Sequence, residues 1–270
     1  MKKTLYTALA LLLVFTSFCS CKATKVKIDE DEKDSKKTFE DTKIEDTQTN
    51  EGEYVKPATF SKAYTVISDR RAEFYDILSA SLKNAKEETQ IFIDIHHALA
   101  GESTFVYVSN LGSVPDDMIS ASLRDGGFSN VKIAQNTSES YTVTGSTNAD
   151  GRTVDFKFDV SYSNEKDSFT ILYSDGSGKS EKIMSVRRDD GFFVQYCGEK
   201  GIRFILRDDG TGKMIFCKEK LFYNSVPETE EEFSDVEYDA FYEIDGVKFH
   251  SIYNGVEYTY PEINGKEAED

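Results

Sequence analysis

Tryptophan is absent from this sequence, and only three histidines occur in its 270 residues. His96 and His97 are adjacent and would point to opposite faces of a strand, while His250 is isolated, so no metal-ligand spacing arises. The Gly-rich segment Ser174–Lys179 lacks the helix that a phosphate loop needs, and no dinucleotide fingerprint is present. We therefore expect no cofactor, no metal centre and no enzymatic activity. A hydrolase whose site is assembled from distant residues stays an alternative, since triads are defined by geometry.

The sequence contains fewer basic residues than acidic ones. The chain has 49 acidic residues against 32 basic ones, which gives a formal net charge of -17. Nucleic-acid binding depends on clustered Lys and Arg, so this composition disfavours it. An acidic exterior also repels anionic lipid headgroups. Any attachment to a membrane must therefore come from a feature other than a basic surface.

No apolar run is long enough to be a membrane span. The longest, Leu5 to Phe18, follows Lys2 and Lys3 and ends before a very polar segment. A spanning helix needs about 20 apolar residues. A basic start, a short apolar run and small residues at its end are typical of a signal peptide. We predict that residues 1–20 are this signal and are removed.

The end of the apolar run, Phe18-Cys19-Ser20-Cys21, resembles the bacterial lipobox. Ser20 supplies the small residue before the acylated cysteine, whereas Phe18 and Cys19 depart from the usual leucine and small residue. The resemblance implies lipidation at Cys21 and export to the bacterial cell envelope, with the outer membrane as the expected location. Acyl chains would then anchor the protein without a transmembrane helix. Cys19 is the competing acceptor, and an ordinary secretory signal is the alternative.

The segment from 21 to 56 is rich in Lys, Glu, Asp and Thr. Its apolar residues, such as Ile28, Phe39 and Ile44, follow no period. So little apolar surface does not offset the loss of chain entropy, and we predict a disordered tether with a root-mean-square reach of roughly 30 Å. A charged, solvated helix is the alternative.

The rest of the chain, 57 to 270, is predicted to form one α+β domain. Apolar residues at helical spacing predict a helix from Phe60 to Leu82, whose apolar stripe should cover a sheet. Ile91–Ile95 and Thr104–Val108 are predicted strands. A short helix is expected from Asp116 to Arg124, where Gly126-Gly127 then stops it.

A long antiparallel meander should follow. The segment 153–162 alternates apolar and polar residues with period two, and short connections of Gly, Asp, Asn and Ser separate the later segments. Further strands are predicted at Ser168–Tyr173, Glu181–Arg187, Phe192–Cys197, Ile202–Leu206, Lys213–Cys217, Val236–Ile244, Val247–Tyr253 and Val256–Tyr260. The predicted fold is a curved, open half-barrel-like antiparallel sheet packed against an N-terminal helix.

Turns of a meander alternate between its two ends, so the turns at Asn164–Asp167, Arg188–Gly191 and Asp208–Gly212 should share one end. The last two contain a repeat, Arg-Asp-Asp-Gly. Two adjacent acidic turns would suit a hard cation such as calcium, but Asp-Gly is also what a tight hairpin requires, and calcium-loop spacing is absent. We favour the hairpin interpretation.

Cys197 and Cys217 are the two cysteines of the predicted domain at 57–270. In the predicted meander one strand lies between them, which places them roughly 10 Å apart, beyond the about 7 Å that a disulfide allows. We predict two free, mostly buried thiols.

Aromatic residues make up 13% of the chain, and tyrosines cluster near its end. Tyrosine combines an apolar ring with a polar tip, which suits a binding surface or an apolar groove. Tyr238, Tyr242, Tyr253 and Tyr258 are the candidate ligand-binding residues. The alternative is that these rings belong to the core of a sheet covered by helices.

A leading helix, a long meander and the segment Tyr242–His250 together resemble the periplasmic lipoprotein carrier and acceptor proteins. The resemblance implies an open half-barrel whose concave face holds acyl chains. A helix-plus-meander unit of the inhibitor-like type fits as well. Our function hypothesis is a membrane-anchored, non-enzymatic binding module for an apolar ligand, a lipoprotein or another envelope protein. A surface-exposed host- or partner-interaction protein is the second hypothesis.

Replacing Cys21 with serine should abolish lipidation and release the protein from the membrane fraction, because no other sequence feature supplies membrane affinity. The measurement is cell fractionation together with the intact mass of the purified protein. A matched Cys19→Ser variant should stay lipidated and membrane-bound. Acyl mass on the Cys21→Ser protein would contradict the assignment.

Overall fold

The structure is a computed structural model, and it describes residues 54–82, 104–198, 201–218, 225–245, 249–253 and 256–260. All of these belong to one structural unit, Gly52–Asp270. The predicted signal at 1–20, the lipidation site Cys21, most of the predicted tether and the predicted strand Ile91–Ile95 lie outside the described residues.

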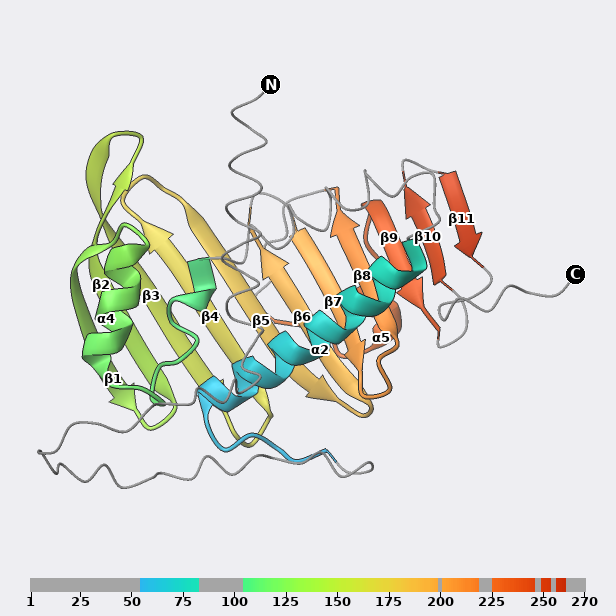
Figure 1. The fold of residues 1–270 in the computed structure, drawn as a ribbon, viewed down its shortest axis with the longest axis horizontal. Helices are drawn as coiled ribbons and strands as arrows, with labels where there is room; N and C mark the ends of the chain where they lie inside the picture. The colour runs from blue at the N-terminus through green and yellow to red at the C-terminus, as the bar shows by residue number, and fades with distance from the viewer. Residues whose placement is uncertain are drawn as a thin grey trace, which may run out of the picture. The chain divides into compact units, whose positions relative to one another are not determined.

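Within the described residues, eleven strands form a single antiparallel sheet in which each strand pairs with its neighbour in sequence (Figure 1). The strands are β1 (Ser129–Thr137), β2 (Ser140–Ala149), β3 (Arg152–Ser163), β4 (Ser168–Asp175), β5 (Ser180–Arg188), β6 (Gly191–Cys197), β7 (Gly201–Arg207), β8 (Gly212–Cys217), β9 (Tyr238–Ile244), β10 (Phe249–Tyr253) and β11 (Val256–Tyr260). The predicted fold class, a curved and open α+β meander, is confirmed.

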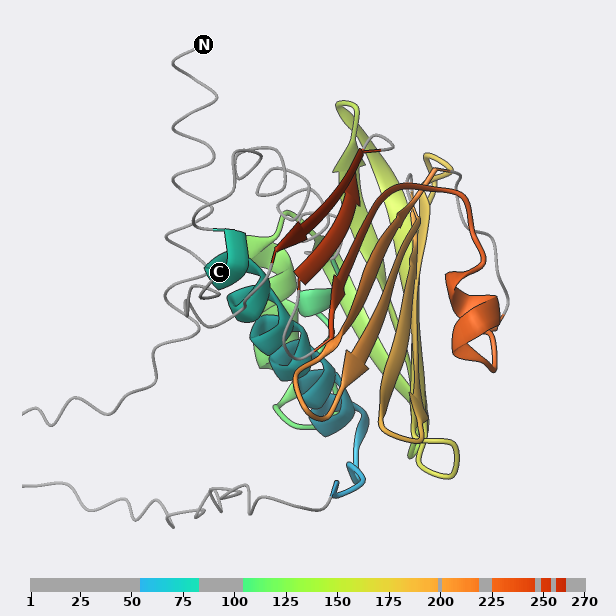
Figure 2. The same cartoon turned by 90° about the vertical axis from the view of Figure 1, so that its right-hand side faces the viewer.

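Helix α2 (Phe60–Leu82) runs across one face of the sheet and has the predicted bounds (Figures 1 and 2). Its buried side chains, Phe60, Tyr64, Ile67, Phe74 and Leu78, recur every three, four or seven residues. This spacing is the single apolar stripe of a helix that packs on one side. Helix α2 contacts strands as far apart as β4 and β7, so it ties the middle of the meander together.

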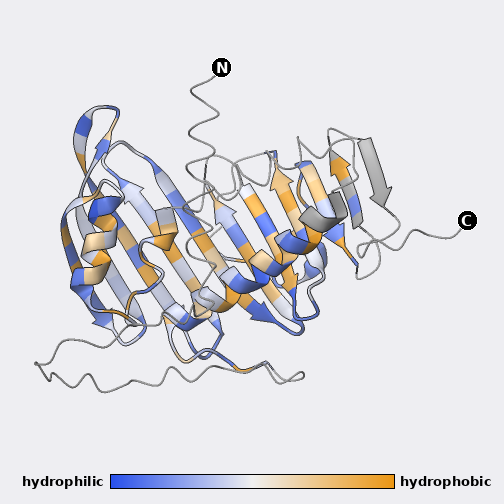
Figure 3. Cartoon of the chain, viewed as in Figure 1, coloured by the Kyte–Doolittle hydropathy of each residue, from blue (hydrophilic) through white to orange (hydrophobic). Residues whose placement is uncertain are grey.

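Strands β3 and β4 bury alternate residues in the core that α2 and α4 cover. Figure 3 shows the hydropathy of the residues along the strands. In β3 the buried residues are Phe156, Phe158, Val160 and Tyr162, and the side chains between them are polar. Helix α4 (Asp116–Asp125) adds Ile119 and Leu123 to the same core. It ends at Gly126, and Gly127 follows with a φ of 89°, as the predicted glycine stop requires.

The opposite face carries the short helix α5 (Glu230–Ser234), which the sequence analysis did not predict (Figure 2). Phe233 of this helix is fully buried against Phe193, with ring centroids 4.9 Å apart. Beneath it lies Arg203, whose Nε donates to Gln195 Oε1 over 3.0 Å and whose guanidinium also donates to the Phe233 carbonyl. The capping box Thr229-Glu230-Glu231-Glu232 was the missed signal, and Thr229 Oγ1 does accept from Glu232 N.

The predicted strand at Thr104–Val108 is wrong. Residues 104–106 are helical, and turns follow, with Val108 N donating to Phe105 O over 3.1 Å and Leu111 N to Val108 O over 3.2 Å. Phe105, Val108 and Leu111 are all buried. The apolar residues thus recur every third position, which suits tight helical turns, and the five-residue window used for the prediction was too short to show it.

Strands β1 and β2 were missed by the sequence analysis. Strand β1 is mostly exposed and contains mainly polar residues. It is the edge of the sheet and pairs with β2 alone among the described strands, so few of its side chains face the core. A strand with little burial has no alternating apolar pattern to detect, and charged or polar residues on such an edge oppose aggregation.

The predicted order around the two cysteines is confirmed. Cys197 of β6 pairs with Gly201 of β7, and Gly201 pairs with Cys217 of β8, so a whole strand lies between the cysteines. Neither forms a disulfide in the described structure, and both are buried. Burial raises the pKa of the Cys217 thiol to about 11, which keeps it protonated and unreactive at neutral pH.

An alkylating reagent should therefore label neither Cys197 nor Cys217 in the native protein, and both after denaturation without reductant. Peptide mass spectrometry of the two cysteine-containing peptides measures the labelling. Two peptides linked to each other and two hydrogens lighter would reveal a disulfide and would overturn the strand order.

Candidate functional site

A cleft of about 730 Å³ lies at one end of the sheet, where the β2–β3 and β4–β5 turns meet the residues before α4. Its walls combine hydroxyl, amide and carboxylate groups with two aromatic rings. The lining residues are Thr104, Phe128, Thr147, Asn148, Ala149, Asp150, Tyr173, Asp175, Ser177, Gly178, Lys179, Ser180 and Glu181. The turns at 164–167, 189–190 and 208–211 lie at the opposite end, as predicted for a meander.

The β2–β3 turn is a tight hairpin turn at Asp150-Gly151, with φ values of 50° and 77°. Such positive values favour Gly and tolerate Asp, which explains this residue pair. Asn148 Oδ1 accepts from Gly151 N over 3.0 Å and fixes the turn. The exposed Asp150 therefore sits at a defined position on the cleft rim.

The β4–β5 turn is organised by Asp175. Its carboxylate accepts from Ser177 N at 2.9 Å, Ser177 Oγ at 2.5 Å, Lys179 N at 3.3 Å and Tyr173 Oη at 2.9 Å. Burial opposes ionisation, but the hydrogen bonds from Ser177 and Tyr173 outweigh it and lower the pKa of Asp175. The predicted turn at Ser174–Lys179 is confirmed, and its acid holds the backbone in shape.

Two further residues give the cleft its charge. Glu181 is only 6% exposed, and Lys179 Nζ lies 3.0 Å from its Oε1. The same ammonium stands 5.6 Å from the centroid of the Tyr173 ring. Burial and the hydrogen bond to Asp175 raise the pKa of Tyr173, so its hydroxyl stays protonated and is a donor at neutral pH. The site thus offers fixed donors, fixed acceptors and an aromatic surface.

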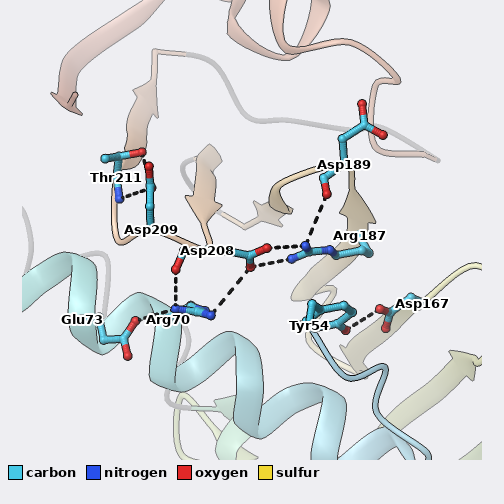
Figure 4. A network of polar contacts seen from close by, with 9 residues as sticks. All are labelled: Tyr54, Arg70, Glu73, Asp167, Arg187, Asp189, Asp208, Asp209 and Thr211. Atoms are coloured by element: carbon cyan, nitrogen blue, oxygen red, sulfur yellow. Dashed lines mark hydrogen bonds and ion pairs between the residues drawn. The ribbon is translucent and has the colours of Figure 1, made fainter. Parts of the chain in front are cut away.

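The acidic turns at the other end form a network with arginines (Figure 4). Arg187 donates through both terminal nitrogens to the Asp208 carboxylate, and Arg70 Nη1 of α2 donates to Asp208 O over 3.0 Å. Asp209 accepts from Thr211 N at 2.9 Å and from Thr211 Oγ1 at 2.7 Å. These carboxylates are engaged by arginine or by their own turn, which is the hairpin role that we favoured. The described residues contain no group of three or more metal-ligating side chains.

The same network contacts Tyr54, the first residue that the structure describes. The Arg187 guanidinium lies 4.0 Å from the Tyr54 ring centroid, and Tyr54 Oη donates to Asp167 (Figure 4). Lys56 Nζ donates to Glu165 O over 3.0 Å. Tyr54 and Lys56, which lie inside the predicted tether, thus contact the β3–β4 turn, and the Tyr54 ring stacks on the Arg187 cation.

Two of the four tyrosines predicted to bind ligand, Tyr238 and Tyr242, pack into different clusters on opposite faces of the sheet. Tyr242 is fully buried in the core beneath α2, with its ring 6.0 Å from that of Phe216. Tyr238 is half-buried on the opposite face, where it packs against the cluster that contains both cysteines. Tyr253 and Tyr258 pair with Ala240 and Ser251 in the ladder. Tyr242 is therefore a core residue, as the alternative interpretation predicted. Tyr238 lies on the opposite face and cannot share a binding surface with it.

Replacing Arg187 with methionine should destabilise the domain by about 2 kcal/mol, because a mostly buried cation loses its bidentate carboxylate and two aromatic contacts. A Lys157→Met variant is the control, since its ion pair with Asp159 is half-exposed and should contribute less than about 1 kcal/mol. Urea unfolding measures both. Equal losses for the two variants would contradict a structural role for the Arg187 network.

Comparison with known proteins gives no further guide to this site. No family model, no curated protein and no solved structure matches the chain. Across the described part of the chain, no helix is both long and apolar enough to cross a membrane. The function must therefore be argued from the cleft and its chemistry.

Proposed function

We propose that this chain is an exported lipoprotein whose folded domain is a non-enzymatic binding module for a small polar ligand. The observation that carries the proposal is the cleft of about 730 Å³ at the sheet end. A volume of this size is typical of small-molecule sites. The positions of its polar groups are fixed by two hydrogen-bonded turns, so they need little reordering when a ligand binds.

The chemistry of the lining favours a polar ligand over the apolar one expected from the sequence. The aromatic face of the sheet, where acyl chains would bind in a half-barrel carrier, is packed against α2 and α4. Phe158, Phe204 and Tyr242 on that face have no exposed surface. The cleft is instead lined mainly by hydroxyl, amide and charged groups. A ligand that leaves these groups without hydrogen bonds would bind weakly.

Binding rather than catalysis is supported by the roles of the charged residues. Asp175 is saturated by hydrogen bonds from its own turn, and the raised pKa of Tyr173 removes it as a base at neutral pH. Neither histidine nor cysteine is among the described lining residues. The site is thus better suited to hold a ligand than to exchange protons with one.

A matched pair of tryptophan variants tests the proposal. Ala149→Trp places a bulky ring on the cleft wall, whereas Ala134→Trp places the same ring on the exposed edge strand β1. In a thermal-shift screen of small polar compounds, a true ligand should raise the melting temperature of the wild type and of Ala134→Trp but not of Ala149→Trp.

The proposal fails if the compounds that stabilise the wild type stabilise Ala149→Trp equally. It also fails if acyl compounds bind and polar ones do not, because that result would restore the apolar-ligand hypothesis. Amide chemical shifts provide the second readout and should change at the β2–β3 and β4–β5 turns.

A further inference from the structure

The buried acid of the cleft has an unused hydrogen-bonding position. Glu181 Oε1 lies 3.0 Å from Lys179 Nζ, but Glu181 Oε2 is buried and has no hydrogen-bond partner within the described structure. A buried carboxylate oxygen without a donor is costly, and nearly all buried polar atoms in proteins are satisfied. This oxygen therefore marks a place where a donor from outside the described residues would be bound.

Glu181 lies at a position in the sheet where an acidic side chain is unusual. It pairs with Tyr173 across the β4–β5 ladder, and Ile183, two residues further along the strand, is buried in the core. Glu181 thus lies in the row of residues that face the core side of the sheet, where an acid is destabilising unless it is paired. Its own partner, Lys179, has a side chain that is 46% exposed, so the pairing is incomplete.

Lys179 shows which kind of group the site prefers. Its ammonium sits against the Glu181 carboxylate and near the face of the Tyr173 ring. A carboxylate beside an aromatic face is the arrangement that recognises ammonium groups. The local charge agrees, since among the described lining residues Asp150, Asp175 and Glu181 stand against one cation, Lys179. A second ammonium would therefore be attracted, and an anion repelled.

We propose that the ligand of the cleft carries a primary ammonium group, which donates to Glu181 Oε2 and competes with Lys179 for this carboxylate. The inference rests on the proposed binding function and names the ligand class for that site. Because Lys179 is half-exposed, it can swing into solvent as the ligand enters. The rim groups Asn148 and Asp150 are then left to bind the rest of the ligand.

The test uses the full mature chain and three probes with the same four-carbon skeleton: putrescine, butanediol and succinate. Putrescine should bind in the cleft and shift the amide resonances of residues 173–181, and the neutral and anionic probes should bind far more weakly. Glu181→Gln should weaken putrescine binding by about tenfold or more, the effect of losing a charged hydrogen bond. Lys179→Met should strengthen it, because a competing like charge is removed.

The matched control is Glu165→Gln, an exposed acid in the β3–β4 turn at the opposite end of the sheet. It changes the net charge by the same amount, so unchanged putrescine affinity separates the Glu181 site from general attraction to an acidic protein. The gain expected from Lys179→Met keeps the inference testable even if Glu181→Gln is poorly folded.

The outcomes separate the inference from the proposed function. If butanediol or succinate binds at residues 173–181 as well as putrescine does, or if Lys179→Met leaves putrescine affinity unchanged, the ammonium inference is wrong and the cleft is still a binding site. If none of the three probes shifts these residues, the ammonium inference is overturned, and the thermal-shift screen with Ala149→Trp decides the proposed function separately.

Discussion

The apolar contact between α2 and one face of the meander is the constraint from which the rest of the structure follows. The helix presents one stripe, with Phe74 and Leu78 almost fully buried, and the strands that it covers, such as β4 and β7, must turn alternate residues towards it. Burying a large apolar side chain contributes about 1.5–3 kcal/mol, so a one-residue slip that moved Phe156, Phe158 and Val160 to the wet face would be severely destabilising. The register fixed in this way also decides which turns meet at each end of the sheet. The hydrogen-bonded turns of the cleft and the Arg187–Asp208 network at the opposite end both depend on this register.

Much of this fold could be predicted from the sequence. Wherever one side of an element is buried, its apolar residues recur with period two in a strand or period 3.6 in a helix. The 60–82 helix and strands such as β3 and β4 have such patterns, whereas β6 and β7 are buried on both faces and were located by the short turns of Gly and Asp around them. Strand β1 has no such pattern, since an edge strand with exposed Lys132 and Gln135 leaves no alternation to detect. The strand prediction for Thr104–Val108 was wrong for the opposite reason. This segment is apolar, but its burial follows every third residue, and that only becomes visible when Leu111 is included.

The candidate site was harder to predict, because it depends on contacts between parts of the chain that no local pattern connects. Glu181 begins a predicted strand, where an acid usually marks solvent, and its burial depends on Tyr173 across the ladder and on the β2–β3 turn beyond. The tyrosines near the end of the chain attracted attention by their number, yet Tyr242 is buried in the core. The number of tyrosines near the end of the chain thus reflected the core, at least for Tyr242. The candidate site is instead marked by a single buried acid, Glu181.

The two ends of the sheet differ in what they contact. Tyr54 and Lys56 contact Asp167 and Glu165 at the end where Arg187 and Asp208 form their network. The cleft lies at the other end. Under the proposed anchoring through Cys21, any pull from the lipid would act first on the arginine network. Because that network is bidentate, stacked on aromatic rings and tied to α2 through Arg70, it resists local opening. The hairpins that hold Glu181 and Asp150 lie at the far end of the strands from that network, so under the proposed anchoring the load would not act on them directly.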